Sequence, residues 1–266
     1  MEARLENPTL FKKILDALRE LVEEANIDCN ETGLSLQAMD ASHVALVSMH
    51  LNRKYFDSFE CKTNLTLGVN LGSIQKILKC GDTDDVLTLR TNEDSTELKF
   101  QFENGGKYFE FSMNLMEIDS EHLSIPESEP EASIKMSSNE FLKICRNLTQ
   151  FGDTVKISVK KNEVSFSLNG NTGSGAAKLS SLEADGDSKQ VEIKTDSSDP
   201  LDLSFALRYL NFFTRASPLS ENVTLELSKD RPLLAKFELD DNAGYIKYYL
   251  APKVDEDEDE EGEAAE

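Results

Sequence analysis

The chain has 266 residues, of which 39% are hydrophobic and 29% charged, so it is long enough for two domains that each bury a core. The net charge of −22 argues against a surface that is basic all round, and no apolar run approaches the roughly 18 residues that a membrane span needs. Residues 255–266 hold nine of the acids and are expected to form a disordered, solvated tail. The rest of the chain still has 41 acids against 28 bases. Any contact with nucleic acid must therefore come from a segregated basic surface.

The N-terminus has no apolar signal-peptide core, so we expect a protein that stays inside the cell. Its four cysteines lie far apart without a Cys-x-x-Cys pair, which favours reduced and mostly buried thiols. The three histidines form no cluster with them, so we expect no metal and no cofactor. Nucleotide-binding glycine motifs and a Gly-x-Ser-x-Gly nucleophile motif are also absent, so no enzyme is predicted.

The first half of the chain reads as one helix followed by alternating strands. Asn7, Pro8 and Thr9 begin a helix whose apolar spacing continues to Ala25. Strands are expected around residues 34–36, 44–49 and 65–69, then a helix at 72–79, then strands at 86–90, 97–103 and 108–115. The Gly105-Gly106 pair predicts a tight turn between the last two strands.

A segment rich in Glu, Ser and Pro, residues 117–133, follows this half and predicts an extended surface connector. It contains an apolar island, Leu123 and Ile125, followed by Pro126. A segment that only spans a gap has no use for these side chains. The island therefore suggests a surface with a second role.

The second half repeats the first. Residues 141–148 (FLKICRNL) align with 11–18 (FKKILDAL), and residues 201–207 (LDLSFAL) align with 65–71 (LTLGVNL) at an offset of 136. Strands are also expected at 155–159 and 164–168, followed by a flexible hairpin at 170–175 (GNTGSG). The repeat predicts an α+β protein of two similar domains, each with a mainly antiparallel sheet and two helices on one face. We expect domains at 1–116 and 134–254, joined by the connector 117–133 and followed by the tail 255–266.

All four expected helices carry basic residues at helical spacing. One such stripe alone is an ordinary solvated face, but four in so acidic a chain suggest a surface for phosphates. With no aromatic or amide side chains among them, these residues would position nucleic acid without reading bases. They are Lys12, Lys13, Arg19, Lys76, Lys79, Lys143, Arg146, Arg208 and Arg215.

Two further surfaces are suggested by the pattern. Met39, His43, Val44 and Leu46 could join the connector island and the late apolar run 248–252 in a groove for a partner's apolar or aromatic side chains. Core packing explains each of these residues alone, and His43 alone would be a structural histidine. The long strand at 108–115 and the segment 173–179 could be unpaired edges, and a contact between two different edges can close a ring.

Several motifs are highly specific and resemble one family over nearly the whole chain up to the tail. They are GLSLQAMDASHV at 33–44, GVNL at 68–71, KILKC at 76–80, LRYLNFFT at 207–214 and YYLAPK at 248–253. Each resembles the proliferating cell nuclear antigens, the eukaryotic DNA sliding clamps. The chain departs from that family at Pro130, near where relatives often have a Tyr, and in its longer and more acidic tail.

The resemblance implies a nuclear homotrimeric ring of six similar domains that encircles double-stranded DNA without sequence preference. Such a ring serves as processivity factor for replicative DNA polymerase and docks repair and translesion synthesis proteins through short clamp-binding peptides. A separate clamp loader would open it. The helices, with their nine basic residues, would line the hole. The rival interpretation is an acidic nuclear interaction protein, such as a histone chaperone, that never touches DNA.

The resemblance also assigns roles to residues outside the helices. The partner-peptide pocket would comprise Met39, His43, Val44, Leu46, Leu123, Ile125, Pro126, Pro232, Tyr249, Ala251 and Pro252. The subunit interface would comprise Tyr108, Phe111, Met113, Leu115, Gly175, Ala177 and Leu179. Lys161 matches the position at which the family is modified by ubiquitin-type isopeptide bonds.

Overall fold

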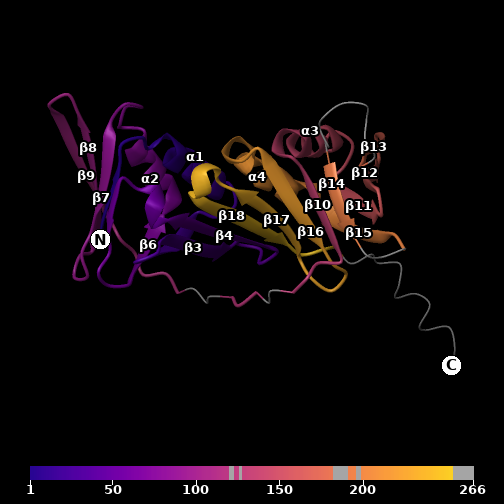
Figure 1. Ribbon diagram of the computed structural model, residues 1–266, viewed down its shortest axis with the longest axis horizontal. Coiled ribbons are helices and arrows are strands. Elements are labelled where there is room, and N and C mark those ends of the chain that lie inside the picture. Colours follow the sequence, from indigo (N-terminus) through magenta and orange to yellow (C-terminus); the bar gives the residue numbers. More distant parts are fainter. Residues whose placement is uncertain (120–122, 126–127, 182–190, 196–198, 254–266) are drawn as a thin grey trace.

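A computed structural model describes residues 1–119, 123–125, 128–181, 191–195 and 199–253. Figure 1 shows an elongated molecule in which the two halves lie side by side, and the described parts of the connector lie along one side of it. Pro126 and the acidic tail 255–266 lie outside the described residues. Within the described part of the chain, no helix is long and apolar enough to cross a membrane.

The first half contains two α-helices, one short 3-10 helix (labelled η) and nine strands. Their bounds are β1 (Glu2–Leu5), α1 (Thr9–Leu18), β2 (Glu24–Asn30), β3 (Gly33–Met39), β4 (Ala45–Asn52), η1 (Arg53–Tyr55), β5 (Ser58–Glu60), β6 (Leu65–Asn70), α2 (Leu71–Leu78), β7 (Val86–Arg90), β8 (Glu97–Asn104) and β9 (Lys107–Asn114). Gly105 and Gly106 both have positive φ, +53° and +86°, which confirms the tight turn between β8 and β9.

The second half repeats this order after the connector. Its described elements are β10 (Ala132–Ser137), α3 (Ser138–Leu148), β11 (Thr154–Lys160), β12 (Glu163–Gly170), β13 (Gly173–Ser180), β14 (Val191–Thr195), β15 (Leu201–Ala206), α4 (Leu207–Phe213), η2 (Thr214–Leu219), β16 (Asn222–Leu227), β17 (Leu233–Glu238), η3 (Asp240–Asn242) and β18 (Gly244–Leu250). The transitions β6–α2 and β15–α4 stand 136 residues apart, so the repeat found in the sequence is confirmed.

Every strand pairing among the described residues is antiparallel, and the described strands form three sheets. A five-stranded sheet (β5-β1-β7-β8-β9) and a four-stranded sheet (β13-β12-β11-β15) occupy the two ends of the molecule (Figure 1). Between them, a nine-stranded sheet (β14-β10-β16-β17-β18-β4-β3-β2-β6) runs through both halves because β18 pairs with β4. The α+β fold class is confirmed, and the two halves share one continuous sheet.

The helices form a layer on one side of that central sheet, in the order α2, α1, α4, α3 (Figure 1). Each turns an apolar face to the sheets: Phe11 and Ile14 of α1, and Phe141 and Ile144 of α3, are at most 4% exposed. The prediction that the first helix continues to Ala25 is wrong, because α1 ends at Leu18 and Ala25 lies in β2. Leu21 and Ala25 stand four residues apart, a spacing that also fits a helix, which explains the error.

The expected hairpin at 170–175 is confirmed, but most of it is strand. Gly170 ends β12 and Gly173 begins β13, so only Asn171 and Thr172 form the turn. A Cβ on Gly170 would lie 1.7 Å from the carbonyl oxygen of Phe151. The glycine therefore permits a close approach of two backbones at this position.

Candidate functional site

The basic residues of the helical layer lie at its solvent face. Lys12 is half-buried and donates to the carbonyl oxygens of Gly81 (2.9 Å) and Asp82 (3.4 Å), which holds its ammonium group at the end of α2. Lys143 forms a 3.4 Å ion pair with Glu140 on its own helix. The exposed members are Lys13, Arg19, Lys76, Lys79, Lys143, Arg146, Arg208 and Arg215.

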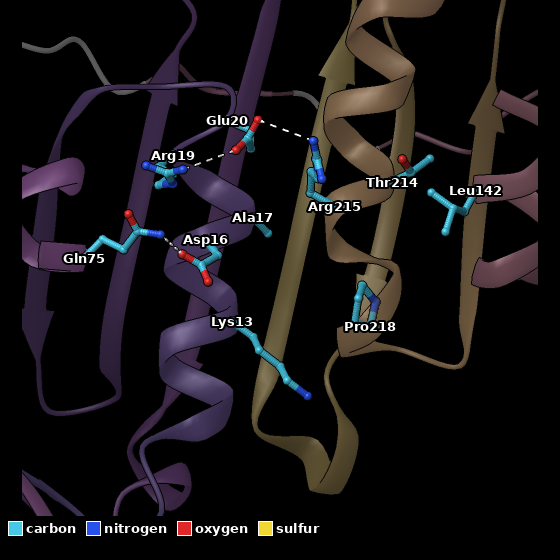
Figure 2. Close-up of a pocket in the computed structure, with 10 residues that line it drawn as sticks. All are labelled: Lys13, Asp16, Ala17, Arg19, Glu20, Gln75, Leu142, Thr214, Arg215 and Pro218. Atoms are coloured by element: carbon cyan, nitrogen blue, oxygen red, sulfur yellow. Dashed lines mark hydrogen bonds and ion pairs between the residues drawn. The ribbon is translucent and has the colours of Figure 1, made fainter. Parts of the chain in front are cut away.

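A cavity of about 460 Å³ opens on this face where α1 meets η2, and Leu142 of α3 also lines it (Figure 2). Lys13 and Arg19 line it from α1 and the residue after its end, and Arg215 lines it from η2. The carboxylate of Glu20 lies 3.6 Å from Arg19 and 3.9 Å from Arg215, so one acid bridges the two halves. The layer thus combines cations with built-in counter-charges.

Arg208 and Arg215 do not share one helix face as their spacing suggested. Arg208 lies in the first turn of α4, whereas Arg215 lies in η2, because α4 ends at Phe213 and tightens into a 3-10 turn. Pro218, within η2, has no N–H to continue an α-helix. The two arginines therefore belong to different parts of the layer.

Arg208 is instead part of a network that crosses between the halves. Its guanidinium lies 4.8 Å from the ring centre of Tyr209 and donates to the Tyr209 hydroxyl (3.0 Å), and that hydroxyl donates to Asp40 Oδ2 (2.9 Å). Asp40 also accepts from the backbone N–H groups of Ser42, Val44 and Ala45. Burial works against ionisation of Asp40, but these donors together hold its pKa below the ordinary value.

The loop that Asp40 organises leads into the predicted groove. His43 is exposed and has a φ of +56°, and Val44 is 36% exposed. The carbonyl oxygen of Val44 accepts from Ala251 N (3.1 Å), which brings the late run of Ala251 and Pro252 against this loop. His43 is thus a surface residue of a turn and no buried structural histidine.

Behind the loop, one row of side chains crosses the outer face of the nine-stranded sheet. Met39 pairs with Leu46, Leu46 with Tyr249, and Tyr249 with Leu234 across four adjacent strands. Leu46 is only 6% exposed, so it forms the floor, while the other three are half-buried. Leu234 was not predicted, although its alternation with buried Leu233 and Ala235 places it on this face.

The connector is hydrogen-bonded over this face at both ends. The side-chain amide of Gln37 donates to the Leu123 carbonyl (3.0 Å) and accepts from Leu123 N (2.7 Å). At the other end, the guanidinium of Arg231 donates to the carbonyls of Ser128 (3.0 Å) and Glu129 (2.6 Å) and to the hydroxyl groups of Ser128 and Ser228. Gln37 and Arg231 were missed because only the fold places them beside the connector.

A cavity of about 780 Å³ lies between this anchored connector and strands β16, β17 and β18. Its apolar lining consists of Ile125, Pro130, Pro232, Leu234 and Tyr249. Leu123 is 41% exposed and lies nearby on the same connector. Of the predicted pocket residues, the structure thus joins Ile125, Pro232 and Tyr249 in one hollow, with Met39 and Leu46 in the adjoining row.

The two predicted edges are the outermost strands of the two end sheets. β9 has only β8 as a described neighbour and β13 only β12, and they lie at opposite ends of the molecule (Figure 1). Tyr108 and Phe109 on β9 are 54% and 52% exposed, whereas Phe111 and Leu115 are half-buried and Met113 is 8% exposed within the core. On β13, Gly175, Ala177 and Leu179 are half-buried. Phe109 was missed, although it belongs to the same alternating run.

The remaining predicted site residue, Lys161, is exposed at the turn between β11 and β12. All four cysteines are free thiols; Cys29, Cys61 and Cys145 are buried and Cys80 is exposed, which agrees with the expectation of mostly buried thiols. Burial raises the pKa of Cys29 to about 12, so this thiol stays protonated at neutral pH. Among the described residues, no group of three or more His, Cys, Asp or Glu side chains could hold a metal ion.

Comparison with known families agrees with this architecture. The family model described as "Proliferating cell nuclear antigen, N-terminal domain" matches residues 1–122, and that described as "Proliferating cell nuclear antigen, C-terminal domain" matches residues 124–253. The two matches meet inside the connector and together span nearly the whole chain. The chain therefore belongs to the proliferating cell nuclear antigen family of DNA sliding clamps.

Proposed function

We propose that three copies of this chain close into a ring around duplex DNA and act as a processivity factor for replicative DNA polymerase. The observation that carries this proposal is the placement of two unlike edge strands, β9 and β13, at opposite ends of one molecule. Pairing of β9 with β13 of the next copy is a heterologous contact, and repetition of such a contact generates a ring when the rotation closes. The predicted domains 1–116 and 134–254 would supply the six domains of that ring.

In this ring the helical layer faces the DNA. The nine basic residues of the layer would contact phosphates, and acids such as Glu20 and Asp16 would keep that attraction weak. Weak attraction suits the function, because the closed ring holds the DNA by topology and needs mobility along it. An acidic exterior would discourage non-specific binding of DNA outside the hole.

The groove under the connector would receive the short clamp-binding peptides of polymerases, the clamp loader, and repair and translesion synthesis proteins. Its apolar row and its cavity of about 780 Å³ suit apolar or aromatic anchor side chains. Met39, His43, Val44, Leu46, Leu123, Ile125, Pro232, Tyr249, Ala251 and Pro252 are proposed to form it. Lys161 is accessible for an isopeptide bond to a ubiquitin-type modifier in the nucleus.

The ring is tested by loading the protein onto nicked circular DNA with a clamp loader and then linearising half of the sample. A closed ring stays on the circle through gel filtration in moderate salt and slides off the linear form. Equal retention on both forms would indicate ordinary binding, and failure to load would favour an acidic chaperone that does not bind DNA. Substitution of Lys13, Arg19 and Arg215 by Gln should shorten retention on the circle only modestly.

A further inference from the structure

Beside the apolar row, the groove contains two lysines directly opposite each other. Lys236 on β17 is the antiparallel register partner of Lys247 on β18, and this pair lies on the same sheet face as Leu234 and Tyr249, in the next row along the strands. Both lysines are half-buried, and both line the cavity of about 780 Å³. Directly opposite side chains in an antiparallel pair have Cβ atoms about 5 Å apart, and like charges there are destabilising.

The two ammonium groups differ in their surroundings. Lys236 forms an ion pair with Glu238 at 2.6 Å. Lys247 lies 4.7 Å from the centre of the Tyr245 ring, and no carboxylate of the described residues forms an ion pair with it. The face of an aromatic ring attracts an ammonium group less strongly than a carboxylate does. Within the described part of the cavity, Lys247 is therefore a cation that lacks a carboxylate of its own.

The other charged groups of the cavity do not supply that carboxylate. Glu226, on β16, stands beside the apolar row opposite Leu234, and Glu129 and Asp230 belong to the connector end and the β16–β17 turn. Arg231, at the same rim, is engaged by the connector. The cavity thus has an apolar row that adjoins a cationic position on the neighbouring row of the same face.

From this placement we infer that Lys247, with Lys236 beside it, forms a subsite for a carboxylate of the bound peptide. The occupant is an Asp or Glu side chain that neighbours the apolar anchor of a partner peptide, and this inference rests on the proposed peptide-binding function. A carboxylate seated there relieves the repulsion between the two lysines and meets a half-buried cation. Selection among partners would then depend on an acidic residue as well as on apolar anchors.

The test uses fluorescein-labelled synthetic peptides with a fixed aliphatic and aromatic anchor, in which a single Glu is placed at each flanking position in turn. Each is compared with its Gln counterpart by fluorescence anisotropy against the full chain. We expect one position at which Glu binds about three- to tenfold more tightly than Gln, as for a hydrogen bond between charged groups at a partly exposed site. The preference should shrink as salt is raised.

Lys247→Gln should abolish the Glu preference, so that the Glu peptide and its Gln counterpart bind this variant equally tightly. Lys135→Gln is the matched control, because Lys135 lies in the same cross-strand row two strands away from Lys236 and outside the cavity. It should preserve the preference. Absence of a Glu preference at every position, or its persistence in Lys247→Gln, would overturn the subsite. If neither the Glu peptides nor their Gln counterparts bound the unsubstituted chain, that result would instead contradict the peptide-binding function itself.

Discussion

The hydroxyl of Tyr209 donates a 2.9 Å hydrogen bond to the carboxylate of Asp40, and both residues are buried. Tyr209 lies on α4 in the helical layer, whereas Asp40 organises the loop that carries His43 and Val44 into the groove. Arg208 stacks on the same tyrosine at the layer's surface. The surface proposed to face DNA and the surface proposed to bind partners are therefore joined by three consecutive contacts.

Tyr209→Phe should destabilise the fold by about 1–3 kcal/mol, since it removes one donor from a buried carboxylate. The measurement is urea unfolding at one fixed protein concentration, because assembly would couple to unfolding. Tyr248→Phe is the matched comparison: its hydroxyl is equally buried but has no hydrogen-bond partner among the described residues. Removal of that hydroxyl should be neutral or stabilising. Equal losses in both variants would contradict the role assigned to the Tyr209 hydroxyl.

The stabilisation by Asp40 should depend on pH. Its pKa is held below the ordinary value of about 3.9, so the folded state favours the carboxylate. This contribution is fully present above the unfolded pKa and is lost as the pH falls through the lower folded pKa. The stability difference between the wild type and Asp40→Asn should therefore be constant from pH 7 to about pH 5 and shrink below about pH 4. Unfolding curves at several pH values measure it, and a gap that widens in acid would refute it.

Arg231→Gln should loosen the C-terminal end of the connector. The substitution removes charge-assisted hydrogen bonds to the carbonyls of Ser128 and Glu129, so amide exchange at Ser128, Glu129 and Glu131 should accelerate. Peptide affinity should fall about three- to tenfold, because the contribution of hydrogen bonds to a charged group is smaller when that group is partly exposed to solvent. Lys229→Gln makes the same charge change at an exposed neighbour and should alter neither quantity. Unchanged exchange in Arg231→Gln would show that the connector does not depend on this residue.

Glu20→Gln should strengthen the attraction of the helical layer for DNA. Without this carboxylate, Arg19 and Arg215 lose a shared counter-charge at 3.6 and 3.9 Å. Retention on circular DNA should lengthen, sliding should slow, and the slope of log affinity against log salt should steepen by up to about one for each additional phosphate that is neutralised. Glu140→Gln frees only Lys143 and should act more weakly. A Glu20 variant that binds DNA no better than the wild type would contradict the role of counter-charge assigned to Glu20 in the cavity of Figure 2.

Local patterns predicted much of this fold. The match of residues 201–207 to 65–71 located the strand-to-helix transitions at both Leu71 and Leu207. This was possible because strand alternation and helical spacing are periodicities of residues that are close together in the sequence. The glycine pair at 105–106 located a turn for the same reason. β1 was missed because four residues are too few to distinguish a strand from a helix. β2 was missed because the four-residue spacing of Leu21 and Ala25 also fits a helix, although Ala25, Ile27 and Cys29 alternate as in a strand.

Long-range relations could not be predicted in this way. The pairing of β4 with β18 joins residues about 200 positions apart, and only the folded structure makes one sheet of the two halves. Gln37 and Arg231 contact the backbone of the connector, whose carbonyl groups have no sequence signature. Tyr209 was apparent only within a motif, and its partner Asp40 lies 169 residues away. The site residues thus came from alternation and family motifs, and the contacts that fix them came from the fold.

The proposed ring is tested most directly by the solution mass of the protein, measured by light scattering over a dilution series in moderate salt without DNA. The edge strands β9 and β13, together with exposed Tyr108 and Phe109, lead us to expect a mass close to three times 29.7 kDa. That mass should persist on dilution into the low micromolar range, as expected of a specific interface (Kd of about 1 μM or tighter). A mass of 29.7 kDa at every concentration would contradict the ring and with it the topological hold on DNA.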